Sequence, residues 1–475
     1  MKYVSTRGQA PELDFEGVLL AGLAADGGLY VPASWPHFSI EEWRAMRGLS
    51  YAELAFRIMR PFLGGAIPDA DFRRMIDEAY GTFGHKAVVP LRQLDANDWL
   101  LELFHGPTLA FKDVALQLLG RLFDWALARS GKRATIVGAT SGDTGSAAIE
   151  GCRGRSALEI FIMFPDGRVS DVQRRQMTTV KDANVHAIAL QGTFDDAQAM
   201  VKALFNDAPF RDGVGLTAVN SINWARVMAQ IVYYAAAALA LGGPDRPVAF
   251  SVPTGNFGDI FAGYCAAKMG LPIHKLIVAT NRNDILARFV QSGAYRKDGV
   301  SPTQSPSMDI QVASNFERLL FDLHGRDAAQ VRALMAELDG QGGFTVSPNA
   351  LAETRQLFAA ARTDEAETTA AIRAAYAASG ELIDPHTAVG LHVAAVARKN
   401  GTVPAEIPLV ALATAAPAKF PAAVQAATGR HPDLPPRMAD LFERPERMTV
   451  LPNDLAVVRA FIQEHIGQKH IGAGA

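Results

Sequence analysis

The sequence has little of what a cross-linked or metal-based protein needs. Only two cysteines, Cys152 and Cys265, occur in 475 residues. Two thiols cannot form a disulfide framework, and their spacing does not match a metal-ligand pattern. We therefore expect no metal site, and a protein of a reducing compartment, the cytoplasm.

The sequence also lacks a charge excess and a long hydrophobic run. Lysine and arginine number 46 against 49 acidic residues, for a net charge of −3, so no basic excess favours nucleic acid or an anionic membrane. The start of the chain has no apolar signal core. The longest apolar run, 227–241, contains Gln230 and two tyrosines and is too short to span a bilayer comfortably. We therefore expect neither nucleic acid nor a membrane among the partners of this protein. A local patch that binds a phosphorylated small molecule is compatible with this composition.

What is present is an alternation of strand-like and helix-like segments from about residue 95. It indicates an α/β protein with largely parallel sheets, which bind ligands at the carboxyl ends of their strands. The charged, alanine-rich stretch 327–380 predicts helices on the outside. The predicted strands are 99–103, 134–138, 158–164, 185–190, 248–253, 275–280 and 409–414, and the clearest predicted helices are 195–205, 223–241, 257–269 and 387–398.

One lysine stands at the start of an apolar helix. Residues 103–113 read LFHGPTLAFKD, and the helix that follows Lys112 is apolar on most sides. Desolvation and the positive end of a helix both favour a neutral amine, which is the form that attacks carbonyl groups. The pattern indicates a Schiff-base lysine. Taken alone, it also fits a lysine that extends its charge to the surface from a helix start.

Two glycine-containing loops follow predicted strands and open helices. The first, 139–148, reads ATSGDTGSAA, and the second, 254–259, reads TGNFGD. Glycine lets the backbone approach a ligand, and N–H groups at a helix start bind carboxylate or phosphate. Ser141 and Thr144 add hydroxyl donors. Either loop alone fits an ordinary turn, but two in one chain favour one site for a cofactor phosphate and one for a substrate anion.

Two further segments carry polar groups suited to a ligand. Residues 220–226 read NSINWAR, and the guanidinium of Arg226 suits forked recognition of a phosphate. Thr414 ends a predicted strand, where its hydroxyl could bond a pyridine nitrogen without protonating it. The alternatives are a surface arginine and a helix N-cap.

In this order, these stretches resemble pyridoxal-phosphate enzymes of the tryptophan-synthase-β type (fold type II). More specifically, the chain is similar to the threonine synthase family, in its longer bacterial and fungal branch. The resemblance extends from residue 3 to about 421. It depends on the sequences at 105–113, 141–145 and 253–259, and on the start of the chain at 3–8 and 26–30.

The resemblance implies an α/β fold with two parallel-sheet domains, the cofactor in the cleft, and an N-terminal domain. The implied N-terminal threonine-synthase-type domain is 1–90. Segments 91–115 and 221–430 would form the large domain that binds pyridoxal phosphate. Residues 116–220 would form a smaller, mobile α/β domain, and 431–475 a C-terminal extension.

The resemblance also implies a role for each candidate site residue. Lys112 holds pyridoxal 5'-phosphate as a Schiff base and then moves protons. Asp143 stands beside the phenolic oxygen of the cofactor, where many relatives have asparagine. The cofactor phosphate would be bound by Gly255, Asn256, Phe257 and Gly258, and the pyridine nitrogen would be contacted by Thr414. The substrate carboxylate would be bound by Ser141 and Thr144. The substrate phosphate would be bound by Asn220, Ser221 and Arg226.

The implied reaction converts O-phospho-L-homoserine and water to L-threonine and phosphate, in threonine biosynthesis, by a monomer or homodimer. One alternative is a pyridoxal-phosphate-dependent phospho-lyase or dehydratase of related amino acids; the predicted phosphate pocket argues against unphosphorylated substrates. A second is a non-catalytic protein that only holds a phosphorylated ligand.

Two positions need separate mention. Ala416 stands where relatives usually have histidine in the TAxPAKF run. Residues 384–387, DPHT, match the family. The match fits a segment that faces the cofactor, but a helix-capping turn explains the motif equally well, and it is not part of the predicted site.

Overall fold

All seven predicted strands and the four clearest helices are present in the computed structural model, which describes residues 1–472, and side-chain surroundings as far as residue 466. Each begins and ends within two residues of its predicted range. The expected α/β class with two parallel sheets is therefore confirmed. The last three positions of the expected C-terminal extension, 473–475, lie outside the described residues.

The chain forms two compact units. The first contains Met1–Val18, Leu23–Ala115 and Ser221–Pro432, and the second contains Leu19–Gly22, Leu116–Asn220 and Asp433–Ala475. Two helices, α1 (Phe15–Ala21) and α5 (Lys112–Ser130), have residues in both units because the chain passes from one unit to the other within them.

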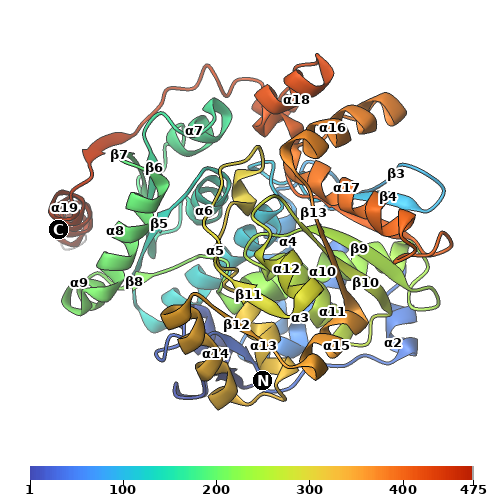
Figure 1. Cartoon of the computed structure of the whole chain (residues 1–475). Coiled ribbons are helices and arrows are strands. Elements are labelled where there is room, and N and C mark those ends of the chain that lie inside the picture. The colour runs from blue at the N-terminus through green and yellow to red at the C-terminus, as the bar shows by residue number, and fades with distance from the viewer. Residues whose placement is uncertain (473–475) are drawn as a thin grey trace. The chain divides into compact units, whose positions relative to one another are not determined.

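The first unit is built on a six-stranded sheet in the order β13-β10-β9-β14-β4-β3 (Figure 1). Neighbouring strands are parallel except β3 and β4. The strands are β3 (Leu91–Gln93), β4 (Asp98–Glu102), β9 (Val248–Pro253), β10 (Ile273–Thr280), β13 (Phe358–Arg362) and β14 (Leu409–Ala413).

Successive residues of β9 contact helices on opposite faces of this sheet. Ala249 packs in one cluster with Val389 and Val393 of α17 (Pro385–Lys399), whereas the ring of Phe250 lies 4.9 Å from that of Tyr234 in α10 (Trp224–Ala240). A central strand buried on both faces is apolar at most positions. Strand β9 reads VAFSVP, and its one polar residue, Ser251, donates its hydroxyl to the carbonyl of Gly390.

Helices and two small antiparallel sheets complete the first unit. The two-stranded sheets are β1 (Tyr3–Ser5) with β2 (Tyr30–Pro32), and β11 (Ala294–Arg296) with β12 (Gly343–Thr345). The remaining helices are α2 (Ile40–Ala45), α3 (Tyr51–Leu63), α4 (Asp69–Tyr80), α11 (Gly258–Lys268), α12 (Ile285–Ser292), η1 (Pro306–Met308), α13 (Phe316–Leu323), α14 (Ala328–Gln341), α15 (Pro348–Leu357), α16 (Glu365–Ser379), η2 (Pro417–Lys419) and α18 (Pro421–Thr428).

The second unit has a five-stranded parallel sheet in the order β15-β7-β6-β5-β8. In its core, strand residues such as Phe161 and Ile188 pack against the helix residues Met200 and Val458. The strands are β5 (Ala134–Ala139), β6 (Leu158–Pro165), β7 (Val185–Gln191), β8 (Leu216–Thr217) and β15 (Thr449–Pro452), and the helices are α6 (Asp143–Cys152), α7 (Asp171–Thr178), α8 (Phe194–Asn206), α9 (Ala208–Gly213), η3 (Pro436–Met438) and α19 (Leu455–Gly472).

For the stretch 327–380 the sequence predicted only helices, and the structure also contains strands there. The stretch contains helices α14 to α16, but β12 and β13 lie between them. Strand β13 reads FAAAR and pairs in parallel with β10 at the edge of the six-stranded sheet. Alanine favours helices, so the sequence gives no sign of this strand; pairing with β10 overrides the local preference.

Among the described residues, no helix is both long enough and apolar enough to cross a membrane. This agrees with the interpretation of the 227–241 run, which forms most of the buried helix α10.

We predict that Gly120→Ala destabilises the protein, because a Cβ at Gly120 would lie 1.9 Å from the carbonyl oxygen of Gly151. Overpacking of this kind costs roughly 1–3 kcal/mol, which should appear as a lower melting temperature. Gly340→Ala is the matched control. Gly340 also lies in a helix, but nothing is within 4 Å of its Cβ position, so alanine should stabilise by about 0.5–1 kcal/mol. Equal effects at the two positions would contradict the proposed close contact.

Candidate active site

Three candidate segments follow neighbouring parallel strands of the first unit. The lysine turn follows β4, the Thr414 segment follows β14, and the glycine loop 254–259 follows β9. Parallel pairing of β14 with both β4 and β9 brings their carboxyl ends to one edge of the sheet. Backbone bonds join two of the segments: Phe111 donates its N–H to the Thr414 carbonyl at 2.8 Å, and Ala416 donates to Leu109 at 3.0 Å.

The turn before Lys112 is organised around the Asp113 carboxylate. This carboxylate accepts hydrogen bonds from the backbone N–H and the hydroxyl of Thr108, both at 2.7 Å. Gly106 is required because a Cβ there would lie 2.4 Å from the Cβ of Asp113. Leu109 adopts a left-handed conformation with φ of 62°, an unusual conformation for leucine. The turn therefore holds the start of α5 in one position.

Lys112 is the first residue of α5 and is only 8% exposed. Its Nζ lies 4.9 Å from the centre of the Phe111 ring. The prediction that this lysine is not freely solvated is therefore confirmed. Thr414, one strand away, is buried as well.

The loop 254–259 has the features of an anion cradle. Its Phe257 has φ of 65°, and α11 begins at Gly258 without a side-chain cap. No hydrogen bond from the N–H of Gly255, Asn256, Phe257 or Gly258 is present within the described part of the chain. Phosphate oxygens fit such a row of donors at a helix N-terminus. These residues therefore fit the phosphate of pyridoxal phosphate.

Asn315 connects this loop to the 220–226 segment, and no sequence pattern indicated a role for it. Its side-chain amide donates to the carbonyls of Asn256 at 3.1 Å and Ser221 at 3.2 Å. The buried Arg318 then binds Asn315 and the carbonyl of Ile222. Both polar residues precede or lie in α13, so their type alone did not distinguish them from ordinary helix residues.

Arg226 lies in the first turn of α10 and is 3% exposed. Burial lowers the pKa of Arg226 to about 10, so the guanidinium is still charged at neutral pH. Asn223 caps the helix by accepting from the N–H of Ala225. Ser221 belongs to the first unit with Arg226, whereas the predicted residue Asn220 is the last of its segment in the second unit.

Asp259 is a second residue that the sequence interpretation left without a role. Its Oδ1 accepts from the hydroxyls of Tyr233 and of Tyr234, the latter at 2.8 Å. Its Oδ2 has no hydrogen-bond partner among the described residues. Burial raises the pKa of Asp259 to about 6, although the two tyrosines and the charge of Lys112 act in the opposite direction.

The other glycine loop belongs to the second unit and has a buried polar centre. The Thr140 hydroxyl accepts from the N–H groups of Gly142 and Gly145, both at 2.9 Å. Gly142 has φ of 138°, and Asp143 accepts from the side-chain amide of Gln173 at 2.9 Å. Asp143 is buried, whereas Ser141 and Thr144 keep part of their surface exposed, as donors for a substrate must.

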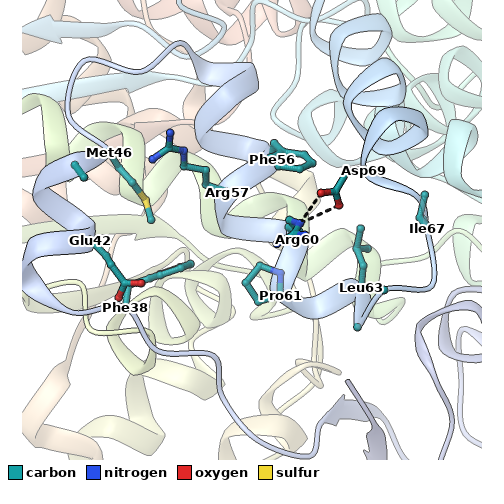
Figure 2. Close-up of a pocket in the computed structure, with 13 residues that line it drawn as sticks. Phe38, Glu42, Met46, Phe56, Arg57, Arg60, Pro61, Leu63, Ile67 and Asp69 are labelled. Atoms are coloured by element: carbon teal, nitrogen blue, oxygen red, sulfur yellow. Dashed lines mark hydrogen bonds and ion pairs between the residues drawn. The ribbon is translucent and has the colours of Figure 1, made fainter.

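A pocket of about 620 Å³ lies elsewhere, among residues 38–69 of the first unit (Figure 2). Its walls are mainly apolar, and Arg60 forms an ion pair with Asp69 there at 2.9 Å. None of the candidate site residues lines this pocket. No group of three or more possible metal ligands is present in the described part of the chain.

Family models for known proteins match most of the chain. The model "Pyridoxal-phosphate dependent enzyme" matches residues 84–350, which contain the buried lysine and both glycine loops. Two others match the ends: "Threonine synthase N terminus" at residues 2–80 and "Threonine synthase, C-terminal" at residues 387–462. Fold and site define an enzyme that uses pyridoxal phosphate as its cofactor.

Similar proteins show which family of pyridoxal-phosphate enzymes the chain belongs to. The threonine synthase of Pseudomonas aeruginosa is 60% identical, over 98% of this chain and 98% of its own length. The structure of pyridoxal-phosphate-bound threonine synthase from Brucella melitensis is similar with a TM-score of 0.95 and 59% identity, over 98% of this chain and 99% of that one. For the Escherichia coli threonine synthase structure the TM-score is 0.82 and the identity 30%, over 98% and 100% of the two chains. The chain belongs to the threonine synthase family.

We predict that Asp259→Asn removes one source of pH-dependent stability. Because the folded-state pKa of about 6 lies above the ordinary value of 3.8, the protonated carboxyl stabilises the folded state. That contribution is complete below about pH 4 and is lost as the pH rises through about 6. Relative to the variant, the free energy of unfolding of the natural protein should fall by on the order of 2–3 kcal/mol as the pH is raised from about 4 to about 7. Urea unfolding at several pH values measures the difference, and a constant difference would contradict the prediction.

Proposed function

We propose that the protein converts O-phospho-L-homoserine and water to L-threonine and phosphate, in threonine biosynthesis. The observation that carries the proposal is the buried Lys112, at the same sheet edge as the uncapped glycine loop after β9. A buried amine next to a phosphate cradle is what a covalently held pyridoxal phosphate requires.

Most of the proposed cofactor-holding residues belong to the first unit. When bound, pyridoxal phosphate makes hydrogens of an attached amino acid acidic by accepting electrons. Lys112 would hold the cofactor at its aldehyde group and would then move protons. Gly255, Asn256, Phe257 and Gly258 bind its phosphate through backbone N–H groups, and the Thr414 hydroxyl contacts its ring nitrogen. A neutral hydroxyl at that nitrogen moderates the electron withdrawal.

Substrate recognition uses hydroxyl, amide and guanidinium side chains. Ser141 and Thr144 bind the substrate carboxylate, with Asp143 beside the phenolic oxygen of the cofactor. Asn220, Ser221 and Arg226 bind the substrate phosphate, since a buried guanidinium stabilises a phosphate strongly. We further propose that residues 116–220 move as a smaller domain around the substrate, with residues 1–90 as an N-terminal domain and 431–475 as an extension.

The partner is thus a small phosphorylated amino acid, and neither nucleic acid nor a membrane is part of the proposal. Cys152 and Cys265 are both free and buried, which supports a cytoplasmic location. A monomer or a homodimer is compatible with the site, because the chain itself provides every proposed contact.

Product analysis tests the reaction directly. The purified protein with pyridoxal phosphate and O-phospho-L-homoserine should release threonine and phosphate in equal amounts. Release of 2-oxobutanoate without threonine would establish the phospho-lyase instead. Absence of both products, with tight binding of the substrate, would indicate a non-catalytic binding protein.

We predict that Lys112→Ala keeps the fold but abolishes turnover, because the variant lacks the amine that is proposed to bind the cofactor aldehyde. Borohydride reduction followed by peptide mapping should find the pyridoxyl group on Lys112 in the natural protein and on no peptide of the variant. Lys268→Ala is the matched control, since Lys268 ends α11 away from the β-strand edge. Activity retained by the Lys112 variant would contradict the assignment.

We predict that Arg226→Ala weakens substrate capture more than it slows the bound substrate. Loss of a buried, charged hydrogen bond costs roughly 1.5–3 kcal/mol, so kcat/KM for phosphohomoserine should fall about 10- to 150-fold, mostly through KM. Arg60→Ala, in the separate pocket of Figure 2, is the control and should leave both constants unchanged. An unaltered kcat/KM in the Arg226 variant would remove this residue from the site.

A further inference from the structure

Asp384 and His386 form a buried polar pair that the proposed reaction leaves without a role. They lie at the start of α17, where the Asp384 side chain accepts from the backbone N–H groups of His386 and Thr387, both at 3.0 Å. Asp384 is 0% exposed and His386 is 3% exposed. Helix capping explains the aspartate. It does not explain a buried histidine two residues later.

Hydrogen-bond partners fix the state of the His386 ring. Its Nδ1 lies 2.6 Å from the Oδ2 of Asp384, and its Nε2 accepts from the backbone N–H of Ser307 at 3.2 Å. Because an acceptor nitrogen carries no proton, the ring proton is on Nδ1 and is donated to Asp384. The aspartate therefore orients the imidazole, and the imidazole holds the peptide N–H of Ser307.

The segment that His386 holds lies against the glycine loop. A Cβ at Gly255 would be 2.8 Å from the carbonyl oxygen of Ser307 and 3.3 Å from the Cα of Met308. Met308 also packs with Val389 and Val393 of α17. The residues of η1 thus fill the space between the start of α17 and the first glycine of the cradle.

The same ring contacts the segment that follows Thr414. The centre of the His386 ring lies 4.8 Å from that of Phe420. Next to Phe420, Lys419 donates its Nζ to the Thr108 carbonyl in the lysine turn at 2.7 Å. One imidazole therefore contacts η1, which packs against the glycine loop, and Phe420, which follows the Thr414 segment.

We propose that Asp384 and His386 are positioning residues for the cofactor phosphate. Through the Ser307 N–H, the pair fixes η1 against Gly255, and this contact sets the shape of the loop whose N–H groups bind phosphate. The inference rests on the proposed role of Gly255–Gly258 in holding that phosphate.

Binding of pyridoxal phosphate and of pyridoxal, which lacks the phosphate, tests this role in cofactor-free protein. His386→Asn reaches only the position of Nδ1 and loses the acceptor for Ser307, whereas His386→Gln places an amide oxygen near the position of Nε2. We expect the asparagine variant to bind pyridoxal phosphate roughly three- to tenfold more weakly, as for one lost hydrogen bond, with pyridoxal affinity unchanged. The glutamine variant should restore the affinity.

A matched control and a second readout separate positioning from general damage. His392→Asn alters another histidine of α17, whose Nε2 lies 3.7 Å from Glu367, and should change neither affinity. The ³¹P resonance of the bound cofactor should shift in the His386→Asn protein and return in His386→Gln. Equal weakening of both ligands, or of neither, would overturn the proposal.

Gly255→Ala provides an independent test, which can be made even if the His386→Asn protein does not fold. The added methyl displaces the Ser307 carbonyl while leaving the Asp384 cap intact, so the same phosphate-selective loss is expected. The double variant should lose less than the sum of the single losses, because both changes act through one peptide. Additive losses would overturn the proposal. Equal affinity of the natural protein for the two ligands would instead refute the phosphate role of the loop itself.

Discussion

The arrangement of the site depends on the parallel pairing of β14 with both β4 and β9. This pairing places the ends of three strands at one edge, although they come from sequence positions near 102, 253 and 413. The lysine turn and the Thr414 segment are then joined by backbone hydrogen bonds. A buried amine and a hydroxyl are held close together because the strands before them are in register.

Buried polar side chains connect the loops above this edge. Asn315 binds carbonyls of the glycine loop and of the segment before α10, and Arg318 holds Asn315 in place. These side-chain donors bind backbone carbonyls of both segments and so hold the segments together. In the same region burial raises the pKa of Asp259 and lowers that of Arg226, so the loops enclose groups with little access to water.

Local sequence predicted the parts of the fold whose signal is local. Strand β9 is a mostly apolar run that ends just before the glycine loop, and Lys112 begins an apolar helix, so both were found. Strand β13 was missed because FAAAR has no strand preference, and its pairing with β10 is a long-range contact. Asn315 and Asp259 were missed for the same reason: their partners lie far away in sequence, and no pattern near them shows that they meet. The roles of the candidate residues stay predictions.

The order of the six-stranded sheet has a consequence for synthesis on the ribosome. Strand β14 lies between β9 and β4 but is made after both. Until residues 409–413 emerge, β4 and β9 each keep one edge with unpaired peptide groups, and such edges attract other chains. The growing chain therefore needs protection from aggregation for most of its translation, and the cofactor can meet a finished site only after nearly the whole chain has left the exit tunnel.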